Sequence, residues 1–267
     1  ALVAQSYPLG TELLHSVRYL DPDAPTQMAT RMKELRYMRK VENPDDWGRQ
    51  RAYEEEASEK AEGKLPTYQG DIEMGFLNKW GWQLQGYIED ARGALRVQTD
   101  EEHRVCMGCH GHIGATIDQV FSFARKVPGA DGWRPQDLRG LRDRPEVGHA
   151  DPELITYFSR VQGGDETRSN DELLARFFRD GRLNERELRR AAVGGDRDLA
   201  WALFPTRARA LALDKAYLAI VREQSFVRGR DAMLAPATRV HPRIDHDDTG
   251  IRSPHRDGNL RLDWSAR

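Results

Sequence analysis

The two cysteines of this 267-residue chain lie three positions apart, in the run Cys106-Met107-Gly108-Cys109-His110. Two cysteines at this spacing, followed at once by a histidine, restrict the segment to a few kinds of site. The interpretations to be separated are a disulfide, a redox-active dithiol, half of a zinc site, and an anchor for covalently attached haem. The residues around the pair decide between them.

A helix is predicted to carry both cysteines. Thr99 and Glu102 have the spacing of a capping box, in which each side chain bonds the other residue's backbone N–H, so the helix begins near Asp100. A thioredoxin-like dithiol would instead need a strand that ends at the first cysteine. Zinc would need two further ligands, and no second CxxC or spaced histidine pair supplies them; the candidates are His103, His110 and His112. The pattern therefore favours haem, with zinc and the dithiol as open alternatives.

The segment with Cys106, Cys109 and His110 resembles the haem-attachment site of a c-type cytochrome. The resemblance covers only this motif. It implies one haem c bonded to both cysteines, with His110 as the proximal iron ligand. It also implies a bacterial protein in the periplasm or at the cell surface, where such haem is normally attached. The runs GWQLQGYIEDARG before the motif and FSFARK after it are loosely similar to large uncharacterised monohaem proteins of that compartment.

The distal iron ligand would separate an electron carrier from a catalyst. The methionine that usually follows the motif in small cytochromes is missing, since Met233 is the only one after Met107. His15 is the leading candidate, because it alternates with apolar residues on one face of a predicted strand. The weaker candidates are His149, Met28, Met32, Met38 and Met74.

The function expected from these residues is single-electron transfer between redox partner proteins, by the haem-bearing part of a larger protein or complex. The alternative is a haem enzyme with an open distal site that activates a small molecule such as peroxide. The balance of 41 basic and 43 acidic residues argues against a nucleic-acid partner. No apolar run reaches the roughly 18 residues of a transmembrane segment.

Hydrophobic periodicity predicts an α+β fold with strands first and helices later. Residues 11–20 have the period of a strand, and residues 80–98 that of a hairpin. The intervening pattern over 30–41 is ambiguous, and 45–65 reads as a solvated helix. Further patterns indicate a strand over 119–126, a helix that starts near Asp151, and apolar stripes over 171–192 and 206–224.

Four segments are expected along the chain. Residues 1–98 form a β-rich, irregular region that packs on the haem, and residues 99–150 form the haem-attachment segment with its CxxCH helix. Residues 151–235 form a mainly helical region, and residues 236–267 an extended tail rich in Pro, Asp and Arg.

Overall fold

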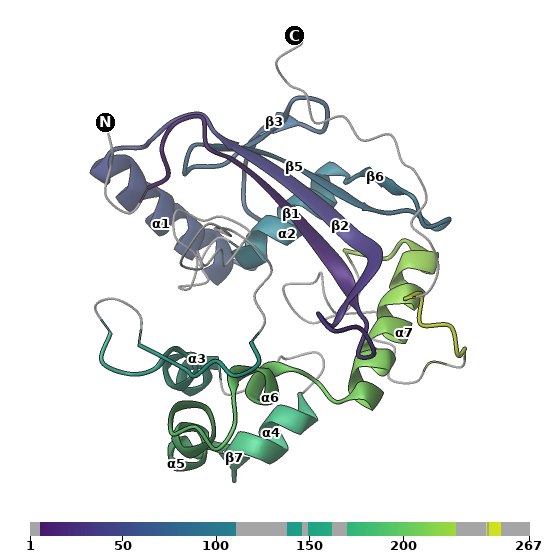
Figure 1. Cartoon of the computed structure of the whole chain (residues 1–267). Coiled ribbons are helices and arrows are strands. Elements are labelled where there is room, and N and C mark those ends of the chain that lie inside the picture. The colour runs from purple at the N-terminus through teal and green to yellow at the C-terminus, as the bar shows by residue number, and fades with distance from the viewer. Residues whose placement is uncertain are drawn as a thin grey trace. The chain divides into compact units, whose positions relative to one another are not determined.

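The chain divides into two compact units, seen in a computed structural model (Figure 1). The first unit comprises Ala1–Ala124 and Leu213–Arg267, and the second comprises Arg125–Ala212. The structure describes residues 6–110, 138–145, 149–161, 170–227, 244 and 246–251. The predicted strand over 119–126 and most of the predicted tail lie outside these residues.

An antiparallel sheet of six strands lies in the first unit (Figure 1). Five strands follow in the order β1-β2-β5-β4-β3. The sixth strand, β6, pairs with the C-terminal end of β5, past the residues of β5 that pair with β4. Their bounds are β1 Glu12–Leu20, β2 Met28–Lys40, β3 Gln69–Asp71, β4 Gly75–Leu77, β5 Trp82–Glu89 and β6 Leu95–Val97. The predicted first strand and the predicted hairpin are confirmed, and the ambiguous segment is the longest strand, β2.

Strand β2 is unusual because it carries three cations in buried or largely buried positions. Arg31 lies 2.5 Å from the carboxylate of Glu89, and the Nζ of Lys40 donates to the backbone oxygen of Trp80 at 2.6 Å. The third cation is Arg36, which is 11% exposed. These charges interrupt the apolar alternation that marks a strand in sequence, although β2 pairs with β1 on one side and β5 on the other.

A hydrophobic core joins the sheet to two helices, α1 (Asp46–Ala61) and α2 (Asp100–His110). The helix predicted over 45–65 is thereby confirmed as α1. It contributes Ala52 to the core, and α2 contributes Met107. The remaining buried members come from the sheet and the turn before β5: Met38, Phe76, Trp80, Trp82 and Leu84. Burying this apolar surface holds both helices to the sheet.

The capping box at the start of α2 is present as predicted. The backbone N–H of Thr99 donates to the Glu102 carboxylate at 2.8 Å, and that of Glu102 donates to the Thr99 hydroxyl at 3.2 Å. Arg96 on β6 donates to both Glu102 oxygens and also to the side-chain oxygen of Gln224, just after α7. Burial opposes ionisation, yet hydrogen bonds from Arg96 and Thr99 lower the pKa of Glu102.

The second unit is mainly helical over its described residues. Its elements are α3 Glu153–Val161, α4 Asp171–Phe177, β7 Phe178–Arg179, β8 Arg182–Leu183, α5 Glu185–Leu188, the π-helical turn η1 Arg189–Val193, and α6 Leu199–Leu203. The apolar stripe over 171–192 is not one helix, because the β7–β8 hairpin interrupts it. Asp180 and Gly181 turn the chain there with φ of 51° and 72°.

Helix α7 (Arg207–Glu223) matches the stripe over 206–224, and its residues from Leu213 onward belong to the first unit. The α+β class is thus confirmed, with an N-terminal antiparallel sheet and later helices. The predicted CxxCH helix exists as α2, but its role in holding haem is not shown. The four-segment division stays a prediction. Over the described ranges, no helix has both the length and the apolar character to cross a bilayer.

Replacing Arg31 with Met is expected to destabilise the fold strongly, because the carboxylate of Glu89 would stay buried without its cation. Glu89 is fully buried and also accepts from the Tyr19 hydroxyl at 2.8 Å. Removing one partner of a buried ion pair costs about 3–5 kcal/mol. Denaturant unfolding at pH 7 measures the loss. The control is Arg39→Met, which breaks an exposed 4.0 Å pair worth less than about 1 kcal/mol; equal losses would contradict the expectation.

Replacing Asp214 with Asn is expected to stabilise the protein at alkaline pH. Asp214, on α7, is fully buried, and its Oδ1 accepts from the backbone N–H of Leu20 at 3.1 Å. Burial, partly offset by Lys33, raises the pKa of Asp214 from 3.8 to about 6. The folded state therefore holds this proton more tightly than the unfolded chain, and stability falls as the pH rises through this window.

Thermal or urea unfolding of Asp214→Asn should show a gain of about 1–3 kcal/mol at pH 8 and little gain near pH 4. The amide oxygen of the variant can still accept from Leu20. A difference between the two proteins that did not change with pH would refute the assignment of the shift to this carboxyl.

Candidate functional site

The first predicted site residue, Cys106, lies where α2 covers one face of the sheet. A row of paired residues crosses this face: His15 on β1 is opposite Arg36 on β2, and Arg36 is opposite Gly86 on β5. Directly paired residues project to the same face of an antiparallel sheet. The row therefore places an imidazole and a guanidinium side by side, next to a position without a side chain.

The missing side chain at Gly86 lets the chain before α2 approach the sheet closely. A Cβ at Gly86 would overlap the side-chain oxygen of the buried Gln98. The other end of that amide, Nε2, donates to the sulfur of Cys106 at 3.4 Å. The amide of Gln98 thus links the sheet face to the cysteine and supplies one hydrogen bond to its sulfur.

His103 fixes α2 to the same point of the sheet. Its Nε2 accepts from the backbone N–H of Gly86 at 2.8 Å, and its Nδ1 lies 2.9 Å from the backbone oxygen of Thr99. These partners assign the proton to Nδ1, and burial lowers the pKa of His103, so the ring is neutral at pH 7. With both nitrogens engaged, His103 is not available as the zinc ligand that the sequence left open.

Arg36 supplies positive charge beside the cysteine. Its Nη2 lies 2.6 Å from the carboxylate of Glu34, which is also largely buried. Burial opposes the charge, but Glu34 and the thiolate form of Cys106 raise the pKa of Arg36. By the same interaction, the guanidinium stabilises negative charge on the Cys106 sulfur.

A phenol from α7 completes this group of residues. The hydroxyl of Tyr217 is buried and has no hydrogen-bond partner among the residues that the structure describes. Its ring packs edge-on against Tyr19, with centroids 5.5 Å apart, and the Nζ of Lys33 lies 4.1 Å from the ring centroid. Burial and the nearby negative charges of Glu34 and Cys106 raise the pKa of Tyr217. The hydroxyl therefore stays protonated and is a donor.

We refer to this group as the Cys106 cluster, defined as Cys106, Arg36, Glu34, Gln98, His103 and Tyr217. It offers a sulfur whose anionic form is favoured by a cation and an amide donor. Thiolates act as nucleophiles and as ligands for soft metals. The cluster is therefore suited to binding a group through sulfur.

The predicted site residues are only partly brought together. The helical backbone runs on through Cys109 and His110, but their side chains lie outside what the structure describes. His15 stands at the edge of the cluster, opposite Arg36, and burial together with that charge lowers its pKa. Its imidazole is therefore neutral at pH 7. Within the described ranges, no group of three or more His, Cys, Asp or Glu side chains is arranged to hold a metal ion.

Sequence reasoning identified Cys106 but missed Arg36 and Tyr217. One signal was available for Arg36. Glu34, Arg36 and Met38 occupy alternate positions of β2, so their side chains lie on the same face of the strand. Two opposite charges next to an apolar residue on one face indicate that this face is covered and that the charges pair with each other. Tyr217 gives no such signal, because it comes from a helix more than a hundred residues away in sequence.

Replacing Arg36 with Met is expected to slow alkylation of Cys106 by about tenfold at pH 7, because loss of the cation lowers the thiolate fraction. The Cys109→Ser background reports on Cys106 alone, and the rate with iodoacetamide is followed by mass spectrometry. Arg39→Met removes an exposed charge from the same strand and should leave the rate unchanged. A rate that is equally fast in Arg36→Met would show that the cation does not act on the sulfur.

Two comparisons relate the chain to lipoproteins. A family model described as a lipoprotein matches residues 1–187. An "Uncharacterized lipoprotein" of Aquifex aeolicus (strain VF5) is 33% identical over 263 residues, which cover 86% of this chain and 45% of the relative. The chain thus spans less than half the length of that relative. No solved structure matches the chain.

These findings leave some of the expectations open. The haem c assignment and the roles of Cys109, His110 and His15 are not tested and stay predictions. The predicted periplasmic or cell-surface location is compatible with a lipoprotein, which a covalently attached lipid holds at a membrane of the bacterial cell envelope.

The predicted c-type cytochrome identity is wrong, and so are the electron-transfer function and the alternative of a haem enzyme. The predicted redox partners rested on that function. The interpretation rested on five residues around Cys106, a motif too short to determine the class of a chain of 267 residues. The family match extends over residues 1–187, including the whole sheet and α2. The chain belongs to this family of lipoproteins.

Proposed function

We propose that the chain is a binding domain of a membrane-anchored lipoprotein on the outer side of the bacterial cytoplasmic membrane. The Cys106 cluster would hold the bound group through a sulfur bond. The family supports the attachment to the envelope, and the cluster supports the chemistry of binding.

The observation that carries the proposal is the pairing of a sulfur with a largely buried cation. Arg36 is 11% exposed and already neutralised by Glu34, so its burial next to Cys106 adds no net charge to the site. A thiolate at Cys106 therefore gives the site one net negative charge, which Arg36 partly offsets and which a bound cation or electrophile would remove. Such a site binds groups that replace the thiol proton: a soft metal ion or an electrophilic prosthetic group.

The compartment gives a further reason to expect a bound group. Outside the cytoplasm the surroundings are oxidising, and a reactive thiolate is oxidised unless it is engaged. A bond from Cys106 to a metal or a prosthetic group would protect the sulfur. The haem c predicted from the CxxCH spacing is one group of this class, and it would engage Cys109 as well.

Protein isolated from the cell envelope is expected to carry about one equivalent of the bound group. Intact mass under denaturing conditions detects a covalent group, and elemental analysis detects a metal ion. Cys106→Ser should lose the group, and Arg36→Met should hold less of it, since the thiolate is no longer stabilised. Arg39→Met is the matched control on the same strand and should retain full occupancy.

An unmodified mass in the native protein, with no bound metal and a Cys106–Cys109 disulfide, would overturn the proposal. The chain would then hold a dithiol pair rather than a bound group.

A further inference from the structure

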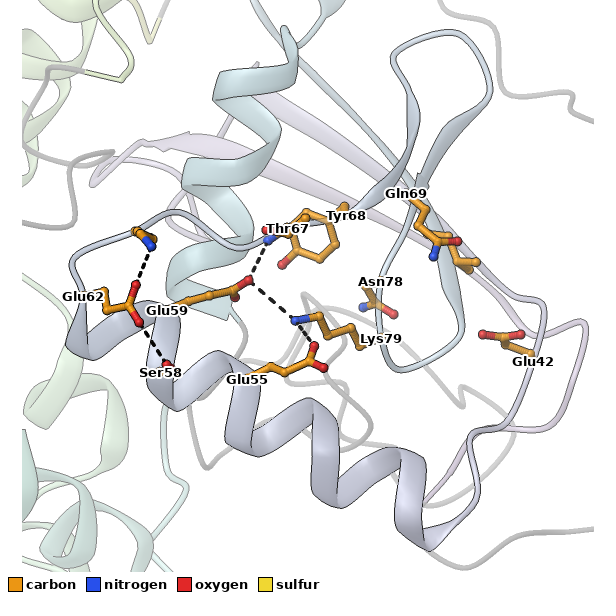
Figure 2. Close-up of a pocket in the computed structure, with 12 residues that line it drawn as sticks. Glu42, Glu55, Ser58, Glu59, Glu62, Thr67, Tyr68, Gln69, Asn78 and Lys79 are labelled. Carbon is orange, nitrogen blue, oxygen red and sulfur yellow. Dashed lines mark hydrogen bonds and ion pairs between the residues drawn. The ribbon is translucent and has the colours of Figure 1, made fainter.

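A second site lies apart from the Cys106 cluster, in a cavity between α1 and the β3–β4 hairpin (Figure 2). The cavity has a volume of about 550 Å³, within the range of small-molecule sites. Its walls are one face of α1, the chain that follows α1, and the residues just after β4. The residues that matter most are Glu55 and Glu59 on α1, Thr67 and Tyr68 after it, and Asn78 and Lys79 after β4.

Most charged groups of the cavity already have partners within it. The Nζ of Lys79 lies 2.7 Å from Glu55 and 3.6 Å from Glu59. Dashed lines mark these two ion pairs in Figure 2. At the rim, Lys64 lies 2.5 Å from Glu62. The remaining carboxylates make the cavity mildly acidic, so a free anion would be repelled.

Asn78, in the wall of the cavity, has an unused donor. The residue is only 2% exposed. Its Oδ1 accepts two backbone N–H groups, from Trp80 at 3.0 Å and from Trp82 at 2.9 Å. These bonds fix the orientation of the amide, because the NH₂ end could not accept them. The Nδ2 is left buried with no hydrogen-bond partner among the described residues.

Glu59, in the wall of the same cavity, has an unused acceptor. Its Oε1 accepts from the backbone N–H of Thr67 at 3.1 Å and lies near Lys79. Its Oε2 is buried and has no partner in the part of the chain that the structure describes. A buried polar atom left unsatisfied costs about 1–3 kcal/mol, so a ligand that bonds to both atoms would gain from two hydrogen bonds that the protein leaves unmade.

We propose that this cavity binds a small uncharged ligand through a secondary amide, whose carbonyl accepts from Asn78 and whose N–H donates to Glu59. A secondary amide offers both an acceptor and a donor, which a simple cation, an anion or an ether does not. The half-buried side chains of Tyr68 and Leu77 line the cavity and can cover the apolar part of such a ligand. In the cell envelope, this chemistry occurs in N-acetylated amino sugars and in short peptides.

The test is calorimetric titration of the full chain with two amide probes, N-acetylglucosamine and N-acetylalanine methylamide. Saturable binding of either probe is expected, and the stronger one identifies the source of the amide. Glucosamine and glucose, which lack the amide, should bind at least about tenfold more weakly. Absence of binding by both amide probes, or equal binding of glucosamine, would overturn the proposal.

Two isosteric variants locate the site. Asn78→Asp keeps the acceptor for Trp80 and Trp82 but loses the donor, and Glu59→Gln replaces the unused acceptor with an amide. Each should weaken binding of the amide probe by about tenfold or more. Glu62→Gln, at the rim, is the control and should bind as the native protein does. Native-like binding by both cavity variants would place the probe elsewhere and refute the assignment.

Discussion

Three buried or largely buried cations on strand β2 organise the first unit. Charges that leave water need partners, and each of these three has one. Arg31 pairs with Glu89 on β5, whereas Arg36 pairs with Glu34 on β2 itself and interacts electrostatically with Cys106 of α2. Lys40 holds the backbone oxygen of Trp80, in the turn that Asn78 also fixes. One strand thereby positions both the Cys106 cluster and a wall of the α1 cavity.

Much of the fold could be predicted from the sequence, because its signals are local. The alternation over 11–20, the turn near Gly93 and the capping box at Thr99 each specify their own element. Two segments could not be assigned in this way. The charges on β2 hide its period, since the partners of Arg31 and Lys40 are distant in sequence. The β7–β8 hairpin keeps an apolar pattern like that of the helices around it, and only its turn at Gly181 breaks that pattern.

The candidate sites were harder to predict, since they combine residues far apart in the chain. Cys106 was identified because its motif is contiguous, but the motif alone suggested a family to which the chain does not belong. Arg36 and Tyr217 become part of the site only through strand register and helix packing. The unused atoms of Asn78 and Glu59 can be recognised only once their other bonds are known. Unpaired polar atoms of this kind are recognised from the three-dimensional structure and cannot be read from the amino-acid sequence.

The first unit is discontinuous in sequence, and this has a consequence for its biosynthesis. The ribosome completes the whole sheet, and then all of the second unit, before it reaches Leu213. Chains grow at about 5–20 residues per second, so several seconds separate the synthesis of the sheet from that of the helix that contributes Asp214 and Tyr217. During this interval the aromatic surface around Tyr19 lacks its cover. The first unit can therefore form completely only once the residues from Leu213 onward are available to it.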